Sequence, residues 1–296
     1  MKHILVFLLT MCLATTQTVA QEGFGFGMQI GLNYSTIRGT SEAITGSTAK
    51  PETFNYNSGL QGGLLVRYGI TDLIGLRLEA NYAQRGMKYT YEGIGIQPFR
   101  EDNGAAILTT GTLKYNLNLT NSYIELPLTV YARLGDHWEV HGGGYFAYLV
   151  KSAADGALTL KGAKTLLGTS VPDYSGTIDY NYLSAADDKA DVSNNKLLFS
   201  EGSYVVKSPA SLGAYYGRGT ANGYLWNRVD FGLVAGLSYR MRSGLTAVAR
   251  FNYGLSDVTN NAVHAMQSSL SADKKFVLRN TDDKNMGVQI SFIFGN

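Results

Sequence analysis

Residues 24–35 read Phe-Gly-Phe-Gly-Met-Gln-Ile-Gly-Leu-Asn-Tyr-Ser, and this stretch decides the fold. Its even-numbered positions are all large and apolar, whereas its odd-numbered positions are all glycine or polar. Successive side chains of a β-strand point to opposite faces, so a period of two is typical of a strand. The stretch therefore predicts a strand with one apolar face and one face that is polar or very small.

Seven further stretches alternate in the same way. They are residues 60–70, 74–82, 123–130, 138–148, 229–240, 245–253 and 286–294. Each of the eight covers roughly the 9–11 residues that a tilted transmembrane strand needs, and eight is an even number of strands. The pattern predicts an all-β fold, an eight-stranded antiparallel up-and-down transmembrane β-barrel.

The links between these stretches differ systematically in length. Three are tight turns, and the other four are long, at about 39–57, 93–108, 152–227 and 256–284. Outer-membrane barrels have short periplasmic turns and long extracellular loops, and this segregation fits them. The alternative is a soluble lipocalin-like barrel with its apolar face inside, but so many large side chains would overfill one cavity.

The N-terminus predicts a cleaved secretory signal over residues 1–20. Lys2 precedes an apolar run over 4–13, and residues 18–20 form an A-x-A-like cleavage site. The run is too short to span a bilayer as a helix. We therefore expect one barrel domain over 21–296, exported to the cell outer membrane and surrounded by its lipid.

Composition narrows the classes of partner. The chain has 25 Lys+Arg against 23 Asp+Glu and no basic stripe, so we expect no nucleic-acid partner. The single cysteine, Cys12, lies in the predicted signal, so we expect no disulfide in the mature chain. His137, His141 and His264 do not form a ligand-spaced cluster, and we expect neither a metal nor a cofactor.

The polar faces of the predicted strands carry charges. A charge on the lipid face costs about 2–4 kcal/mol for Arg or Lys at the midplane, so these residues must face the lumen. Eight strands leave an interior that side chains fill. We predict a closed lumen that is plugged by ion pairs, with a charge network of Arg67, Arg77, Glu79, Glu125, His141, Asp230, Arg240 and Arg250.

Two irregularities stand out. Pro127 lacks an N–H, so its strand should be bulged or should lack one ladder bond. Within residues 86–120 the apolar positions change from even to odd numbers. We interpret this segment as the outer ends of the third and fourth strands, a hairpin that projects beyond the membrane, with bulges where the phase changes.

The chain resembles the eight-stranded outer-membrane barrels common in Bacteroidetes, which are described as porin-like or PorT-like. Four segments carry the resemblance: 122–128 (Ser-Tyr-Ile-Glu-Leu-Pro-Leu), 142–145 (Gly-Gly-Gly-Tyr), 230–236 (Asp-Phe-Gly-Leu-Val-Ala-Gly) and 250–255 (Arg-Phe-Asn-Tyr-Gly-Leu). The resemblance implies an eight-stranded barrel, recognition by the outer-membrane assembly machinery and, by analogy alone, a role in a secretion system.

The long extracellular link 152–227 is the strongest candidate for specific binding. Tyrosine gives a large contact area at low entropic cost, so an exposed loop of this kind suits an extracellular protein or glycan. The candidate binding residues are Tyr174, Tyr180, Tyr182, Tyr204, Tyr215 and Tyr216. The alternative is that the segment caps the barrel mouth or forms extended hairpin ends.

Several functions remain open at this point. We expect a non-enzymatic protein with a structural or surface-binding role through its extracellular loops. A small-solute porin would need a wider lumen than eight strands provide. An enzyme acting on outer-membrane lipid would rest on His141 with Asp230 or Glu125 as a dyad, whereas a lumen histidine bound to a carboxylate is the simpler interpretation. An accessory protein of a secretion system is the fourth possibility.

Overall fold

The computed structural model describes residues 23–43, 50–100, 106–184, 190–192, 196–216 and 223–295. The predicted signal, 1–20, lies outside these residues. The strands are β1 (Phe24–Arg38), β2 (Glu52–Gly69), β3 (Ile74–Arg100), β4 (Ala106–Leu134), β5 (Trp138–Thr165), β6 (Tyr174–Asn181), β7 (Ala190–Asp191), β8 (Leu197–Glu201), β9 (Tyr204–Lys207), β10 (Ser211–Leu212), β11 (Val229–Arg240), β12 (Thr246–Gly254), β13 (Ala265–Leu270), β14 (Phe276–Leu278) and β15 (Lys284–Gly295). In this part of the chain there is no helix with the length and apolar character to cross a membrane.

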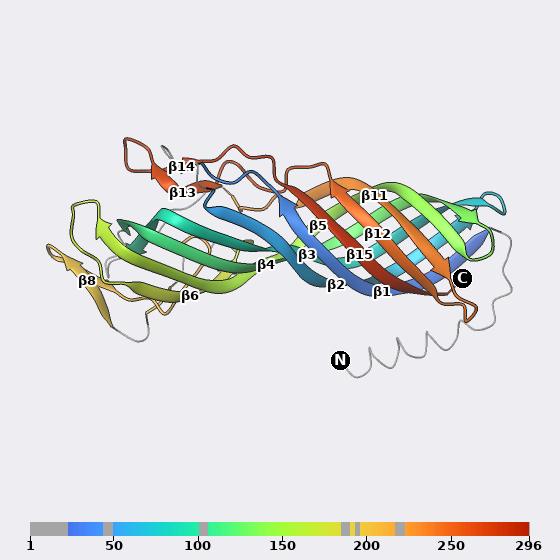
Figure 1. The fold of residues 1–296 in the computed structure, drawn as a ribbon, viewed down its shortest axis with the longest axis horizontal. Coiled ribbons are helices and arrows are strands. Elements are labelled where there is room, and N and C mark those ends of the chain that lie inside the picture. Colours follow the sequence, from blue (N-terminus) through green and yellow to red (C-terminus); the bar gives the residue numbers. More distant parts are fainter. Residues whose placement is uncertain are drawn as a thin grey trace.

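Eight of the strands close into an antiparallel barrel. Their order is β11-β12-β15-β1-β2-β3-β4-β5, and β5 pairs with β11 to complete the ring. The predicted eight-stranded barrel is therefore confirmed. Figure 1 shows the barrel at one end of an elongated molecule, with the C-terminal end of β15 near the short turns. That end is periplasmic, and the long connections are extracellular.

The outer face of the barrel is apolar, because it meets hydrocarbon. Ile30, Leu64 and Ile290 are each about 60% exposed on this surface, at 60%, 58% and 58%. Aromatic pairs mark its two ends, as expected at membrane interfaces. Tyr34 and Tyr56 stack near the extracellular end (ring centroids 4.8 Å apart). Trp138 and Tyr239 pack edge to face at the periplasmic end (4.8 Å).

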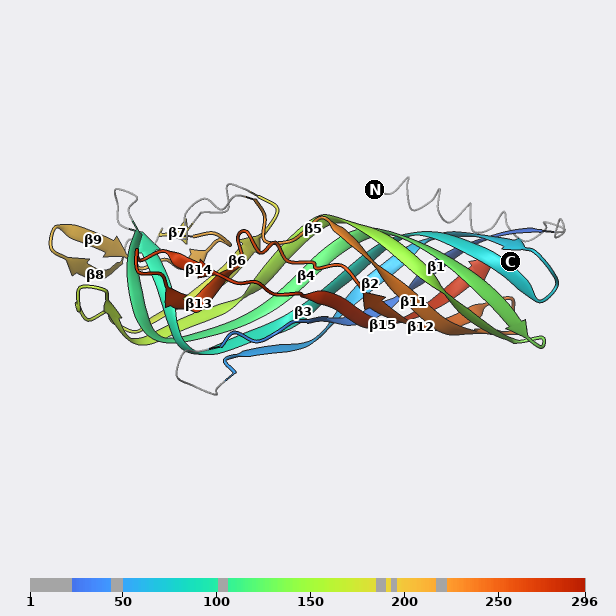
Figure 2. The same ribbon diagram turned by 90° about the horizontal axis from the view of Figure 1, so that it is seen from above.

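Strands β3, β4 and β5 continue far beyond the barrel (Figure 2). β3 and β4 keep one register from Ile74↔Ala132 at the periplasmic end to Arg100↔Ala106 at the outer end. The same face of β3 therefore points inward throughout. Within the membrane that face carries charged residues such as Arg77, but farther out it carries apolar ones such as Met87. The reason is that apolar groups avoid water: they face lipid within the bilayer and an internal core above it.

The prediction of bulges in the third and fourth strands, where the apolar positions change phase, is wrong. Their pairing is continuous there, and what changes is the chemistry of the inward positions. Irregularities occur instead in the neighbouring pairs, between Tyr56 and Gln61 of β2 against β3 and between Ser122 and Tyr123 of β4 against β5. The prediction for Pro127 holds, since the β3–β4 pairing is interrupted between Leu78↔Leu128 and Asn81↔Glu125.

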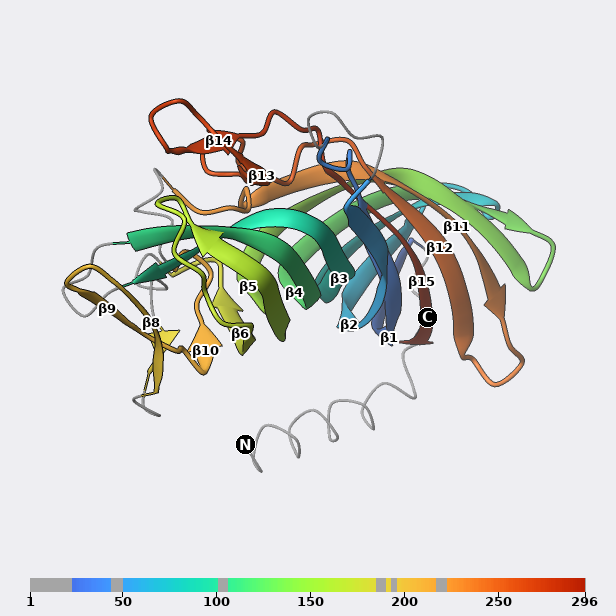
Figure 3. The ribbon, with the colours of Figure 1, turned by 60° about the vertical axis from the view of Figure 1, so that its left-hand side comes forward.

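Segment 152–227 is not an open loop. Its first part is the outer half of β5, which pairs with β6, and β10 and β7 extend the same sheet. β8 and β9 form a separate hairpin at the tip, and the β13–β14 hairpin lies over the concave side of the extended sheet, where β13 contacts β3 (Figure 3). A large cluster of buried apolar side chains fills the space between these parts.

Candidate functional site

Glu79 is the hub of an ion-pair cluster in the lower part of the lumen. Arg250 donates two hydrogen bonds to its carboxylate, both 2.8 Å long, and Arg77 Nε lies 3.0 Å from Oε1. Gln29 and Asn81 donate further hydrogen bonds to Oε2, at 2.6 and 2.9 Å. The carboxylate is thus almost fully buried but has donors on both oxygens, as a buried charge requires.

Glu139 extends this cluster toward the periplasm. It forms ion pairs with Arg67 and with Arg77, whose Nη1 lies 3.3 Å from Oε1. The guanidinium of Arg67 also lies over the ring of Tyr131, 4.3 Å from its centroid. Glu139 and His141 are two residues apart on β5, so both side chains point to the same, inward face of the strand.

A second cluster, centred on Arg85, closes the upper lumen. Arg85 pairs with Glu125 and with Asp230, whose Oδ2 lies 3.3 Å from Nη1. Asp230 also accepts hydrogen bonds from Tyr145 (3.1 Å) and Asn285 (2.9 Å). In the two clusters together, four guanidinium groups face four carboxylates, so the buried charges compensate one another and fill the lumen with side chains.

Two residues of the predicted lumen network differ from expectation. Arg240 ends β11 at the periplasmic rim and its side chain is exposed, because the strand ends where water begins. His141 is buried, yet its hydrogen-bond partner in the described chain is Ser238 (3.4 Å) and not a carboxylate. Asp230 and Glu125 are engaged with Arg85 instead, so the expected dyad is not assembled.

A cavity of about 550 Å³ lies above the barrel, between the extended sheet and the 256–284 segment. Its walls come from β2, β3, β4 and β6, from the segments before and after Trp226, and from the β13–β14 hairpin. This volume is in the range of pockets that hold small molecules. The lining residues of β2, β3 and β4 belong to the outer parts of these strands, so the cavity lies on the extracellular side of the barrel.

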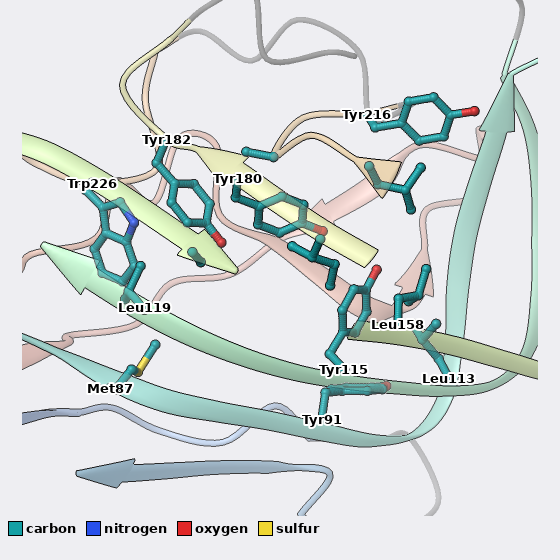
Figure 4. Close-up of a cluster of buried hydrophobic side chains, with 14 of the residues drawn as sticks. Met87, Tyr91, Leu113, Tyr115, Leu119, Leu158, Tyr180, Tyr182, Tyr216 and Trp226 are labelled. Atoms are coloured by element: carbon teal, nitrogen blue, oxygen red, sulfur yellow. The ribbon is translucent and has the colours of Figure 1, made fainter. Parts of the chain in front are cut away.

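Most of the cavity wall is apolar or aromatic. Figure 4 shows the two sides facing each other, with Tyr180, Tyr182 and Trp226 on one and Met87, Tyr115 and Leu119 on the other. The rings pack edge to face, with Tyr182 at 6.0 Å from Trp226 and at 5.5 Å from Tyr180. Edge-to-face packing fixes these rings, so this side of the cavity is preformed.

Glu52 forms a polar contact at the cavity wall that ties the sheet to the hairpin segment. Its Oε1 accepts hydrogen bonds from Tyr89 and from Arg279, both 2.7 Å long, and its Oε2 accepts one from the backbone N–H of Glu42 (2.5 Å). Burial and the neighbouring Glu52 carboxylate both raise the pKa of Tyr89, so its hydroxyl remains a donor at neutral pH. Burial acts to lower the pKa of Arg279, but the charge of Glu52 outweighs it and the net shift is upward.

Asp283 provides the other carboxylate of the wall. Its Oδ2 accepts hydrogen bonds from Thr259 (2.8 Å) and Thr281 (2.9 Å), and His264 Nδ1 lies 3.9 Å away. Burial raises the pKa of Asp283 against these hydrogen bonds, which act to lower it. Both carboxylates of the cavity are therefore already satisfied by protein donors.

The structure corrects the expected exposure of the loop tyrosines. Tyr174, Tyr180, Tyr182 and Tyr216 are buried in the extracellular core, Tyr215 is half-buried, and Tyr204 is exposed on the β8–β9 hairpin. The cause is that segment 152–227 folds back on the sheet, so its rings pack inward. Tyr180, Tyr182 and Tyr215 line the cavity, whereas the other three do not.

Sequence reasoning missed Arg85 and the polar residues of the cavity. Arg85 continues the odd-numbered inward positions 77, 79, 81 and 83 of the third strand. Extending the predicted strand from residue 82 to residue 85 would have identified it. Glu52 and Arg279 gave no local signal, because they are 227 residues apart and meet only through the folding of two long connections.

Comparisons with known proteins give one family match and distantly similar solved structures. A family model described as outer membrane protein beta-barrel domain matches residues 17–260. A search of the curated proteins found no match. Among solved structures, Ail of Yersinia pestis is 10% identical over 93% of this chain and 100% of its own, with a TM-score of 0.31. OprG from Pseudomonas aeruginosa is 10% identical over 94% of this chain and 99% of its own, with a TM-score of 0.35.

The family match covers most of the chain, including all of the first seven barrel strands. It agrees with the closed ring of eight strands, the apolar outer face and the charged lumen described above. The protein is therefore located in the cell outer membrane, and the chain belongs to the family of outer membrane protein beta-barrel domains.

Proposed function

We propose that this protein is a non-enzymatic surface-binding barrel whose extracellular cavity takes a small, largely apolar ligand. The observation that carries the proposal is the cavity of about 550 Å³ with preformed aromatic walls, held outside the membrane by the extended strands. Pockets of this size with apolar walls and a few polar groups are typical ligand sites. The barrel serves as the anchor and the extension as the binding unit.

The lumen favours binding over passage of solutes. A porin needs a water-filled channel, whereas buried side chains from the Arg85 and Glu79 clusters occupy this interior. An eight-stranded barrel has no spare width to move them aside. A second cavity, beside Arg85 and Asn33, measures only about 10 Å³ against about 550 Å³ for the extracellular cavity.

We expect Leu117→Trp to weaken ligand binding at least tenfold. Leu117 lines the cavity and is only half-buried, so an indole at this position would fill the space that a ligand needs. The measurement is saturable fluorescence of N-phenyl-1-naphthylamine with the protein in lipid nanodiscs, after subtraction of the signal from empty nanodiscs. Leu126→Trp is the matched control, because Leu126 faces lipid and its replacement leaves the cavity unchanged. Equal saturable binding by all three proteins would refute the proposal.

The route to the membrane is part of the same proposal. We infer that residues 1–20 are removed on export and that the outer-membrane assembly machinery inserts the barrel, within the PorT-like group that segments such as 122–128 resemble. Mass spectrometry of the protein purified from outer membranes should give a mature chain that begins at Gln21. A chain that retains Met1 would contradict cleavage, while removal at another residue would correct only the site.

A further inference from the structure

The polar groups of the cavity wall differ in whether they are already paired. The carboxylates of Glu52 and Asp283 accept hydrogen bonds from protein donors, as described above. Three tyrosine hydroxyls are also engaged: Tyr89 donates to Glu52, Tyr115 to Gln97 (2.8 Å) and Tyr215 to the carbonyl of Tyr182 (2.8 Å). A ligand therefore gains little by offering donors to these groups.

Trp226 presents a donor that is not paired. Its side chain is only 4% exposed, lines the cavity, and has no hydrogen-bond acceptor for Nε1–H among the described residues. A buried indole normally finds such a partner, because an unsatisfied buried donor is costly. In Figure 4 the ring lies beside Leu119 and Tyr182. Trp226 therefore adds a hydrogen-bond donor, and no acceptor, to the cavity wall.

Two lysines supply positive charge at the edge of the same cavity. Lys274 and Lys275 are exposed residues of the turn between β13 and β14, and both line the cavity. Within the described part of the chain neither ammonium group forms an ion pair, unlike Arg279, which is neutralised by Glu52. Trp226, Lys274 and Lys275 therefore each present a donor to the cavity, and the two lysines carry a full positive charge.

The backbone of Lys274 adds an independent observation. Its φ is +57°, and it is the one non-glycine residue with positive φ in the described chain. Glycine or asparagine adopts this conformation at lower cost, and lysine has a side chain that the turn itself does not need. Hydrogen bonds from Lys274 N–H to the Ser271 carbonyl (2.9 Å) and from Ser271 N–H to the Lys275 carbonyl (2.8 Å) close this turn, so its geometry fixes the position of both lysines at the cavity edge.

From these contacts we propose that the ligand is an anionic amphiphile, a long-chain carboxylate whose hydrocarbon lies in the aromatic cavity and whose carboxylate meets Lys274 and Lys275. This inference rests on the proposed function and adds the chemical class of the ligand. A neutral apolar molecule would leave the lysines unused, and a cationic one would be repelled by them. Charge complementarity at the edge and an apolar interior together select the anionic amphiphile.

The test uses the two tryptophans of the chain, Trp138 and Trp226. In Trp138→Phe, Trp226 is the only indole, and it lies in the cavity wall. The protein in nanodiscs is titrated with 9,10-dibromostearate, whose bromines quench indole on contact, and with the methyl ester of the same acid. We expect saturable quenching by the acid, with a Kd at least tenfold lower than that of the ester. Trp226→Phe retains only Trp138 at the membrane interface and should show non-saturable quenching from partition into lipid.

Charge-reversal variants in the Trp138→Phe background locate the carboxylate. We expect Lys274→Glu with Lys275→Glu to raise the Kd of the acid at least tenfold and to leave the Kd of the ester unchanged. Lys88→Glu is the matched control, since Lys88 is exposed on β3 and does not line the cavity. Circular dichroism first verifies that each variant retains its strand content.

The outcomes separate the two proposals. Equal Kd values for acid and ester, or no effect of reversing both lysines, would overturn the anionic ligand while the apolar binding site stands. Saturable quenching of Trp226 by neither probe would overturn the binding site itself. Loss of quenching by both probes in the double lysine variant would show that the turn only maintains the shape of the cavity. The lysines would then not recognise the carboxylate, which also contradicts the inference.

Discussion

Replacing Glu79 by alanine is expected to lower the free energy of unfolding of the barrel by about 3–5 kcal/mol, the usual cost of removing one partner of a buried ion pair. The change leaves the guanidinium groups of Arg77 and Arg250 without their shared carboxylate, and both are buried among other side chains. Arg77 retains Glu139, but Arg250 has no second ion pair among the described residues. Urea titration in detergent micelles, monitored by tryptophan fluorescence, measures the effect.

A double-mutant cycle tests the cause. Removing Arg250 together with Glu79 also removes the orphaned charge, so the double variant should be less unstable than the sum of the two single variants. Glu79→Gln keeps the shape of the side chain but not its charge, and we expect most of the loss to remain. Strictly additive single effects would show that the lumen tolerates an unpaired guanidinium and would contradict the ion-pair account.

Adding one methyl group at Gly143 should destabilise the barrel by about 1–3 kcal/mol, the range of overpacking in tight interiors. A Cβ at Gly143 would lie 2.8 Å from Thr129 Cα and would also overlap the Leu128 carbonyl, and these backbone atoms of β4 cannot move without breaking the ladder. Urea unfolding of Gly143→Ala against the parent protein gives the value.

The neighbouring glycines are the controls for this prediction. At Gly142 and Gly144 a Cβ would meet its nearest neighbour at 3.7 and 3.5 Å, which is ordinary van der Waals contact. Alanine at either position should change the free energy of unfolding far less than alanine at Gly143. A similar loss at all three positions would indicate a general cost of replacing glycine in this strand and not a close approach on the lumen side.

Period-two alternation predicts the barrel because each membrane strand has one face toward lipid and one toward the lumen. Successive residues along the strand therefore alternate between apolar and polar. It placed Glu79 and Arg250 in the lumen for the same reason. Alternation misleads at residues 86–120, where the change of apolar positions predicts bulges that the structure does not have in β3 or β4. In the structure the inward side is unchanged, and the surroundings change from lipid to water.

The extracellular part was less predictable because its contacts join segments that are distant in sequence. The local sequence does not distinguish a tyrosine that faces water from one that faces a core. Tyr182 is buried because segment 152–227 returns to pair with β5. The cavity depends on Glu52 and Arg279 meeting across two connections. Arg240 shows a smaller failure of the same kind, since alternation gives the face of a strand but not where the strand leaves the membrane.

The continuous pairing of β3 with β4 has a mechanical consequence. From residue 86 to residue 100 the strand rises roughly 50 Å at about 3.3 Å per residue, without a loop that could serve as a hinge in that pair. The paired outer parts of β3 and β4 therefore connect the cavity rigidly to the barrel. If the barrel tilts to accommodate a thinner or thicker bilayer, the cavity turns through the same angle, and the direction in which it faces its surroundings changes with it.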